Sequence, residues 1–236
     1  MRLLVRLGLV ILLLALAAAV YQLTPSYPDL GGEEDVKLYP IDQAEQNQDL
    51  LEFRKRFIDA VKAKDLDFVL EHIDDTIKYT FGLNEGTAGF LREWELDQNP
   101  DQSRFWDETL EVLMLGGEFT NPEKTLFTAP YVFTSFPEDL DAFQHVAVIE
   151  REVKVYREPN RDADVLGVLN YSIVRNLTHN DRYVFESNGQ LWRKIETFSS
   201  QIGYVPDQYL RSPVDYRLSF YNQGPKWQLI FFVAGD

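Results

Sequence analysis

The sequence predicts an α+β protein in which a helix-rich part comes first and an all-β part follows. Apolar residues recur with helical spacing from Leu50 onward, whereas short β runs and turns fill residues 146–212. Two further strands with alternating polarity close the chain. Hydrophobic residues make up 45% and aromatic residues 14% of the 236 residues. This composition supplies a core and excludes a chain that is disordered throughout.

The charge balance and the missing cysteine exclude several classes of protein. Asp and Glu outnumber Lys and Arg by 38 to 23, which gives a net charge of −15. Such a chain repels phosphate backbones, so we expect no nucleic-acid partner. The sequence contains no cysteine. Disulfides, thiol catalysis, iron–sulfur clusters, cysteine-bound zinc and lipoprotein acylation are therefore excluded.

Residues 1–23 are typical of an export segment. Arg2 and Arg6 precede an uncharged apolar stretch over residues 7–20, and small residues before Ala19 fit a cleavage site. The same stretch, extended to the end of the segment, reaches the roughly 17 residues needed to span a bilayer. A cleaved signal peptide and a retained N-terminal membrane anchor therefore both fit. Either one places the remaining chain in the periplasm or cell envelope, with membrane contact only through this segment.

Residues 24–48 predict a flexible, solvated linker. They contain Pro25, Pro28, Pro40, two adjacent glycines and the acidic run Glu33–Asp35, with little periodicity. The alternative is a disordered N-terminus of the mature chain.

Residues 49–145 predict the first, α+β domain. Apolar spacing indicates a helix over residues 50–61, and Asp65 is placed to cap a second helix over 66–73. Ser103 is placed to cap a longer helix that ends before two glycines at 116 and 117. The remaining expected elements are a strand at 76–81, a helical turn at 90–95, and strands at 125–128 and 131–134.

The first domain resembles the opening of NTF2-like cone domains. The resemblance rests on the segment AVKAKDLDFVLEHIDDTIKYTFG and on the order of elements over residues 50–133. It implies two helices that lead into a strand of a curved sheet.

Residues 146–212 predict a small β-barrel. Short strands are expected at 146–149, 153–156, 165–169, 173–177, 183–185, 191–195 and 203–205, separated by polar turns. The segments VKVYREPNRDADVLGVL, LWRKIE and GYVPDQYL resemble, in this order, the bacterial SH3 (SH3b) family. The chain departs from that family at residues 154–157, where the family carries Asn-Val-Arg, and in the long tract 178–189.

Residues 213–236 predict a final β-hairpin, with strands at 216–221 and 227–233. An SH3b barrel is complete without it, and so apolar a hairpin needs another sheet to cover it. NTF2-like domains end in such a hairpin. We therefore expect it to complete the first domain, with the SH3b barrel inserted before it. The arrangement also resembles exported bacterial SH3-domain proteins that end in Phe-Val-Ala-Gly-Asp.

The sequence contains no recognisable catalytic, metal-binding or cofactor-binding motif. His72, His145 and His179 lie in separate segments without metal-ligand spacing, and neither a GxSxG elbow nor a phosphate loop is present. Acidic residues near the tryptophans of the first domain could include a general acid, but a solvated acidic helix face explains them better. These are Glu93, Glu95, Asp107, Glu108, Glu111 and Glu118. We expect a protein that is not an enzyme, with no metal and no cofactor.

Aromatic side chains are the better candidates for a binding site. The barrel zone carries four tyrosines and a neighbouring arginine that could capture peptides or sugars on a shallow groove: Tyr156, Tyr171, Tyr204, Tyr209 and Arg157. The alternative is that some of these tyrosines fill the barrel core. With the SH3b resemblance, they imply a binding or scaffolding protein whose partners are peptidoglycan peptides or envelope proteins.

Two other functions fit the sequence. The first is a small-molecule pocket in the cone-like domain, with or without catalysis, lined by Tyr79, Phe81, Trp94 and Trp106. It predicts a buried acid, such as Glu93 or Asp107. The second is a purely structural role in oligomerisation.

Overall fold

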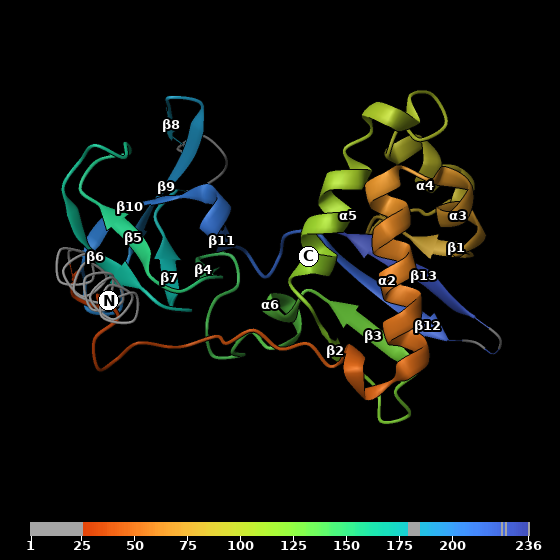
Figure 1. Cartoon of the computed structure of the whole chain (residues 1–236), viewed down its shortest axis with the longest axis horizontal. Helices are drawn as coiled ribbons and strands as arrows, with labels where there is room; N and C mark the ends of the chain where they lie inside the picture. Colours follow the sequence, from red (N-terminus) through yellow and green to blue (C-terminus); the bar gives the residue numbers. More distant parts are fainter. Residues whose placement is uncertain (1–25, 179–184, 223, 225, 236) are drawn as a thin grey trace, which may run out of the picture.

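The computed structural model describes residues 26–178, 185–222, 224 and 226–235 (Figure 1). The predictions for residues 1–23 and for His179 lie outside these residues. The described part combines helices with two β-sheets. Within it, no helix is both long enough and apolar enough to cross a bilayer.

The first unit, residues 42–144 and 212–235, is built on a five-stranded sheet in the order β1-β13-β12-β3-β2. Figure 1 shows α2 and α5 lying across this sheet. Its strands are β1 (Ile73–Lys78), β2 (Glu118–Phe119), β3 (Leu126–Ala129), β12 (Arg217–Asn222) and β13 (Trp227–Val233). Its α-helices are α2 (Gln48–Ala63), α3 (Leu66–Glu71), α4 (Gly86–Glu93), α5 (Phe105–Met114) and α6 (Tyr131–Thr134), with 3-10 turns η1 (Ala44–Gln46) and η2 (Pro100–Gln102).

Side-chain caps fix where the first two helices begin. The Asn47 side chain accepts a hydrogen bond from the Leu50 N–H at 3.1 Å, and Asp65 accepts one from the Phe68 N–H at 3.0 Å. Each cap satisfies a backbone donor that the helix itself leaves unpaired. Lys64 ends α2 in the left-handed region, with φ 54°. The short loop between α2 and α3 is therefore sharply bent, and Asp65 caps α3 as the sequence predicted.

Aromatic side chains form the core of the first unit. Phe220 on β12 meets Phe53 and Phe57 of α2 with ring centroids 5.0 and 5.1 Å apart. Trp94, after α4, stacks on Phe232 of β13 at 4.8 Å. The final strands therefore contribute five buried residues to this core: Leu218, Phe220, Trp227, Leu229 and Phe232.

The C-terminal hairpin lies in the middle of the first sheet. β12 pairs antiparallel with β3, and β13 pairs parallel with β1. Residues 146–212 thus interrupt the stretch of chain that forms this sheet.

The second unit, residues 145–211, is all β apart from a 3-10 turn. Its main strand order is β11-β4-β7-β9-β10-β5-β6, and β8 pairs with β9. The elements are β4 (His145–Val148), β5 (Val153–Tyr156), β6 (Val165–Leu169), β7 (Ile173–Asn176), β8 (Phe185–Ser187), β9 (Gln190–Glu196), β10 (Ile202–Pro206), η3 (Asp207–Tyr209) and β11 (Leu210–Arg211). Alternating residues such as Val153, Val155 and Val205 are buried and form a separate core.

A short helix replaces the strand predicted at 131–134. The backbone bonds helically here, with Ser135 N donating to Tyr131 O at 2.9 Å, and Tyr131 and Val132 are both fully buried. In α6 both side chains reach an apolar cluster with Ala147 of β4 and Ile173 of β7. Burial also raises the pKa of Tyr131 to about 12, with a smaller contribution from Tyr171. This cluster joins the two units.

The first strand also lies three residues earlier than the predicted 76–81. Ile73 and Ile77 face the core, whereas the chain after Lys78 turns away. The Asn84 side chain accepts hydrogen bonds from the N–H groups of Tyr79 and Thr80 and thereby closes a loop. A side chain that satisfies backbone donors in this way competes with strand pairing.

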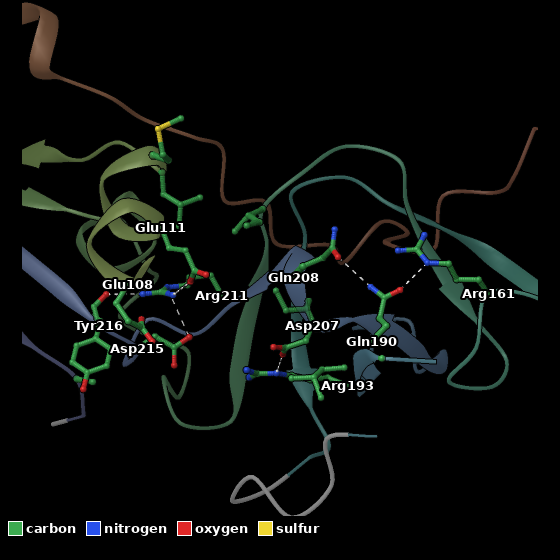
Figure 2. Close-up of a pocket in the computed structure, with 17 residues that line it drawn as sticks. Glu108, Glu111, Arg161, Gln190, Arg193, Asp207, Gln208, Arg211, Asp215 and Tyr216 are labelled. Atoms are coloured by element: carbon green, nitrogen blue, oxygen red, sulfur yellow. Dashed lines mark hydrogen bonds and ion pairs between the residues drawn. The ribbon is translucent and has the colours of Figure 1, made fainter. Parts of the chain in front are cut away.

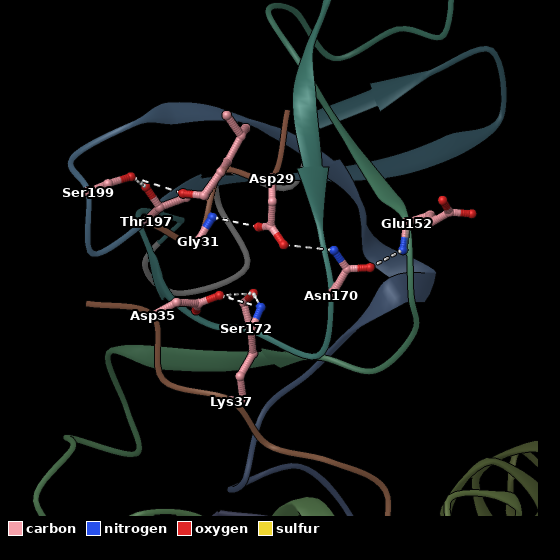
Figure 3. Close-up of polar contacts among 10 residues, drawn as sticks. Asp29, Gly31, Asp35, Lys37, Glu152, Asn170, Ser172, Thr197 and Ser199 are labelled. Atoms are coloured by element: carbon pink, nitrogen blue, oxygen red, sulfur yellow. Dashed lines mark hydrogen bonds and ion pairs between the residues drawn. The ribbon is translucent and has the colours of Figure 1, made fainter. Parts of the chain in front are cut away.

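The prediction of a flexible linker at residues 24–48 is wrong for the described part. Residues 26–38, which we call the strap, run along the second unit (Figure 3). Backbone hydrogen bonds join Leu30 N to Val168 O at 2.9 Å and Ile173 N to Val36 O at 2.8 Å. Leu38 is 5% exposed, and Leu30 packs on the second core. The strap therefore adds to the second sheet, although its composition is that of a linker.

Polar side chains also hold the strap in place (Figure 3). Asp29 accepts hydrogen bonds from the Gly31 N–H at 2.9 Å and from the Asn170 amide at 3.0 Å. Burial opposes ionisation of Asp29, but these bonds and the charge of Lys37 hold its pKa below the usual value. The Ser172 hydroxyl donates to Asp35 at 2.8 Å. The partners Asn170 and Ser172 lie 141 and 137 residues from Asp29 and Asp35, so the sequence alone does not pair them.

Candidate functional site

A cleft of about 1010 Å³ lies between α5 of the first unit and the second unit (Figure 2). One wall carries Glu108, Glu111 and Met114 of α5. The facing wall comes from four separate segments of the second unit. It includes Arg161, Gln190, Leu191, Gln208 and Arg211.

Two apolar side chains are exposed inside this cleft. Met114 at the end of α5 is 63% exposed, and Leu191 on β9 is 48% exposed. Leu191 points outward because its neighbour Trp192 fills the core of the second unit. The cleft therefore offers apolar contact on both walls.

A directed chain of hydrogen bonds runs along the second-unit wall (Figure 2). Arg161 Nε donates to Gln190 Oε1 at 2.7 Å, and Gln190 Nε2 donates to Gln208 Oε1 at 3.1 Å. A guanidinium has no acceptor, so it fixes which end of the Gln190 amide faces it. The orientation of Gln208 follows from that of Gln190. This leaves the Gln208 amide nitrogen as a donor toward a ligand.

Arg211 connects the two walls. Its guanidinium lies 3.5 Å from Glu111 of α5 and 3.8 Å from Asp215, and it donates to the Tyr216 carbonyl at 2.8 Å. The Arg211 side chain is 10% exposed, whereas that of Glu111 is 66% exposed. This pair helps to hold α5 against β11.

Glu108 is the one carboxyl in the cleft with a perturbed pKa among the described residues. Burial raises the pKa of Glu108, and the charges of Glu111 and Asp215 add to this effect. Arg211 and Arg104 act in the opposite direction. Glu108 is thus a half-buried acid beside a buried arginine.

The structure separates the five residues predicted for the barrel surface. Tyr156 and Tyr209 line a smaller pocket of about 220 Å³, but Tyr156 is 5% exposed and packs edge-on against Trp192. Tyr204 lies opposite Tyr156 in the pairing of β10 with β5, but its ring packs against Phe185. Tyr171 lies under Arg151, and Arg157 lies beside Asp164 at 3.4 Å. Of the five predicted residues, only Tyr156 and Tyr209 line the smaller pocket.

The four residues predicted to line a pocket in the first unit do not share one. Trp94 and Trp106 are 1% and 3% exposed and belong to the core, whereas Phe81 is 54% exposed. Tyr79 is half-buried, packs edge-on against Phe90 and lines a shallow depression near Arg92. Trp94 stacks on Phe232 at 4.8 Å and so belongs to the packed core rather than to a pocket lining.

The predicted acids Glu93 and Asp107 and the histidine His72 lie in different environments. Glu93 and Asp107 are exposed, so the prediction that one of them is buried is wrong. His72 is buried, stacks on Phe68 at 4.3 Å and contacts the Phe68 carbonyl through its Nδ1 atom. Across the described residues, no three His, Cys, Asp or Glu side chains cluster so as to hold a metal ion.

The sequence analysis named Glu108 and Glu111 as acids but missed the residues of the facing wall of the cleft. Arg161 lies in a predicted polar turn and Gln208 in the segment that resembles the last SH3b strand, but no motif marks either one. Comparisons with protein-family models, with curated proteins and with solved structures find no match to this chain.

Proposed function

We propose that this chain is a non-enzymatic binding protein of the bacterial cell envelope and that its cleft receives a short, extended peptide of the cell wall. The observation that carries this proposal is the lining of the cleft. Gln190 and Gln208 offer side-chain amides, which match the donors and acceptors of a peptide backbone. Met114 and Leu191 offer apolar contact on opposite walls for the peptide's side chains.

The proposed fold is an NTF2-like first domain with an inserted SH3b barrel. The segments that resemble SH3b correspond to β5 with β6, to β9, and to β10 through β11, and β9, β10, β5 and β6 are neighbours in the sheet. The final hairpin pairs with β1 and β3, which supports this proposal because NTF2-like domains end in such a hairpin. Residues 1–23 would export the chain, as a cleaved signal or as an anchor.

The shape of the site favours a short peptide over the surface of a folded partner. The cleft is recessed between two units and is lined by a mixture of charged, amide and apolar side chains. Pockets for small apolar ligands are lined mainly by hydrophobic residues. A few peptide residues therefore fit this lining better than an apolar small molecule does.

A pull-down with purified, insoluble peptidoglycan tests the proposal. The full chain is expected to be retained above an albumin control. Leu191→Asp places a charge in the cleft and is expected to reduce retention. Ile202→Asp is the matched control, because Ile202 is 44% exposed on β10 and does not line the cleft.

Retention of the wild-type chain at the albumin level would refute a cell-wall ligand. Equal loss of retention in the two aspartate variants would show that binding does not use the cleft. Capture of an envelope protein without retention on peptidoglycan would favour a protein partner instead.

A further inference from the structure

We infer that Arg161 recognises a carboxylate of the bound peptide and that the neighbouring peptide residue enters the smaller pocket beside it. This inference rests on the proposed function and names the chemistry that the cleft selects. It depends on three properties of Arg161: its direction of hydrogen bonding, its charge and its position.

The first property is that the wall around Arg161 presents N–H groups. Arg161 uses Nε to orient Gln190, which leaves the two Nη groups of the guanidinium for a ligand. The same chain of bonds leaves the Gln208 amide nitrogen as a donor. A wall of donors pairs with acceptors, and the carboxylate is the acceptor that a guanidinium binds best.

The second property is that the charge of Arg161 has no counter-ion among the described residues. The other two arginines in the cleft are compensated: Arg193 pairs with Asp207, and Arg211 pairs with Glu111 and Asp215. Arg161 has no carboxylate within the 4.0 Å ion-pair distance in the part of the chain that the structure describes. In a chain of net charge −15, this is a local site for an anion.

The third property is that Arg161 lies where two depressions meet. It lines both the large cleft and the smaller pocket of about 220 Å³. Tyr156, Pro206 and Tyr209 give the smaller pocket an apolar part. A carboxylate on Arg161 therefore places the adjoining side chain next to these rings.

Around the smaller pocket, the positive charge of Arg161 is the one that no lining carboxylate balances. Glu150 and Glu152 are matched in number by Arg151 and Lys154. The rim is thus neutral without Arg161, and the pocket as a whole favours one negative charge.

Soluble disaccharide-peptides, released from peptidoglycan by a muramidase, test this inference. One half of the preparation keeps its carboxylates, and the other half has them converted to amides with carbodiimide and ammonium. Calorimetry gives the affinity of each half for the full chain. We expect the amidated peptides to bind about tenfold more weakly, which is typical of losing a hydrogen bond to a charged group.

Four variants locate the effect. Arg161→Gln should weaken binding of the native peptides about tenfold and abolish the difference between native and amidated peptides. Arg157→Gln is the matched control, since Arg157 is exposed in the same unit but pairs with Asp164. Tyr209→Ala should weaken both halves of the preparation, whereas Tyr204→Ala, outside both depressions, should not.

Each outcome separates this inference from the proposed function. If native and amidated peptides bind the wild-type chain equally, Arg161 does not recognise a carboxylate. The proposal that the cleft binds a peptide is then unaffected. The same conclusion follows if Arg161→Gln keeps the full dependence on carboxylates. If neither insoluble peptidoglycan nor its soluble peptides bind, both the proposed function and the role of Arg161 are refuted.

Discussion

Replacing Phe232 with alanine is expected to destabilise the first unit much more than the second. Phe232 is fully buried on β13, where its ring stacks on Trp94 at 4.8 Å and meets Phe105 and Tyr216 at 5.9 and 5.3 Å. The residue therefore ties the last strand to the helices of the first unit. Its neighbour Phe231 is half-buried on the opposite face and is the matched control.

The size of the effect follows from these contacts. Truncating a buried phenylalanine to alanine costs about 3–5 kcal/mol, and each aromatic pair contributes roughly 0.5–1.5 kcal/mol beyond buried area. With three aromatic partners, Phe232→Ala belongs near the upper end of this range. Phe231→Ala should cost about 1 kcal/mol, as for an average substitution. Since domains are stable by roughly 5–15 kcal/mol, the first variant brings the first unit close to unfolding.

Urea denaturation followed by tryptophan fluorescence measures this loss. Trp94, Trp106 and Trp227 report on the first unit and Trp192 on the second. Amide hydrogen exchange of β5 and β9 follows the second unit separately. A loss below about 1 kcal/mol, or one equal to that of Phe231→Ala, would refute the assignment of Phe232 to the centre of this core.

Two further predictions concern pH. The lowered pKa of Asp29 means that its ionised form stabilises the folded chain above the ordinary pKa of 3.8, and that this contribution is lost as the pH falls through the lowered pKa. Asp29→Asn should therefore melt at a lower temperature than wild type at neutral pH, and the two should converge in acid; a constant gap would contradict this account. For Glu108 the pH dependence of stability has the opposite sign. Because its pKa is raised, the folded chain binds more protons than the unfolded chain above the ordinary pKa of 4.5. The stability of the wild-type chain should therefore fall as the pH rises above this value. The melting temperature of Glu108→Gln should rise relative to wild type over the same pH range. A difference that does not change with pH would contradict this explanation.

Local patterns in the sequence predicted most individual elements. The caps at Asn47 and Asp65 begin helices close to the expected positions, although the sequence marked only Asp65. The predicted strands at 153–156, 165–169 and 227–233 agree with β5, β6 and β13. These elements depend on residues that are near one another in the chain, so periodicity and turn chemistry are enough to find them.

Elements that depend on distant partners were not predictable in this way. Residues 131–134 have the composition of a strand, but Tyr131 and Val132 turn toward β4 and β7 of the other unit. The strap has the composition of a linker because its stability comes from partners more than 130 residues away, such as Ser172 for Asp35. Tertiary contacts override local preference in both places.

The same limit applies to the site. Glu111 and Arg211, which hold the cleft walls together, are 100 residues apart. The tyrosines were visible in the sequence as candidates, but alternation alone could not decide which of them face the core. Tyr156 does, against Trp192. Residue type therefore identified candidate residues, but not which of them are buried.

The strap also determines how the molecule would respond to mechanical load. Tension that enters the chain at Ser26 first reaches the backbone bonds between the strap and β6, at Val168, and only afterwards reaches α2. The force then acts on β6, the edge strand of the second sheet, before it acts on the helices of the first unit. Stretching the chain from this end should peel the strap away before it disturbs the aromatic core.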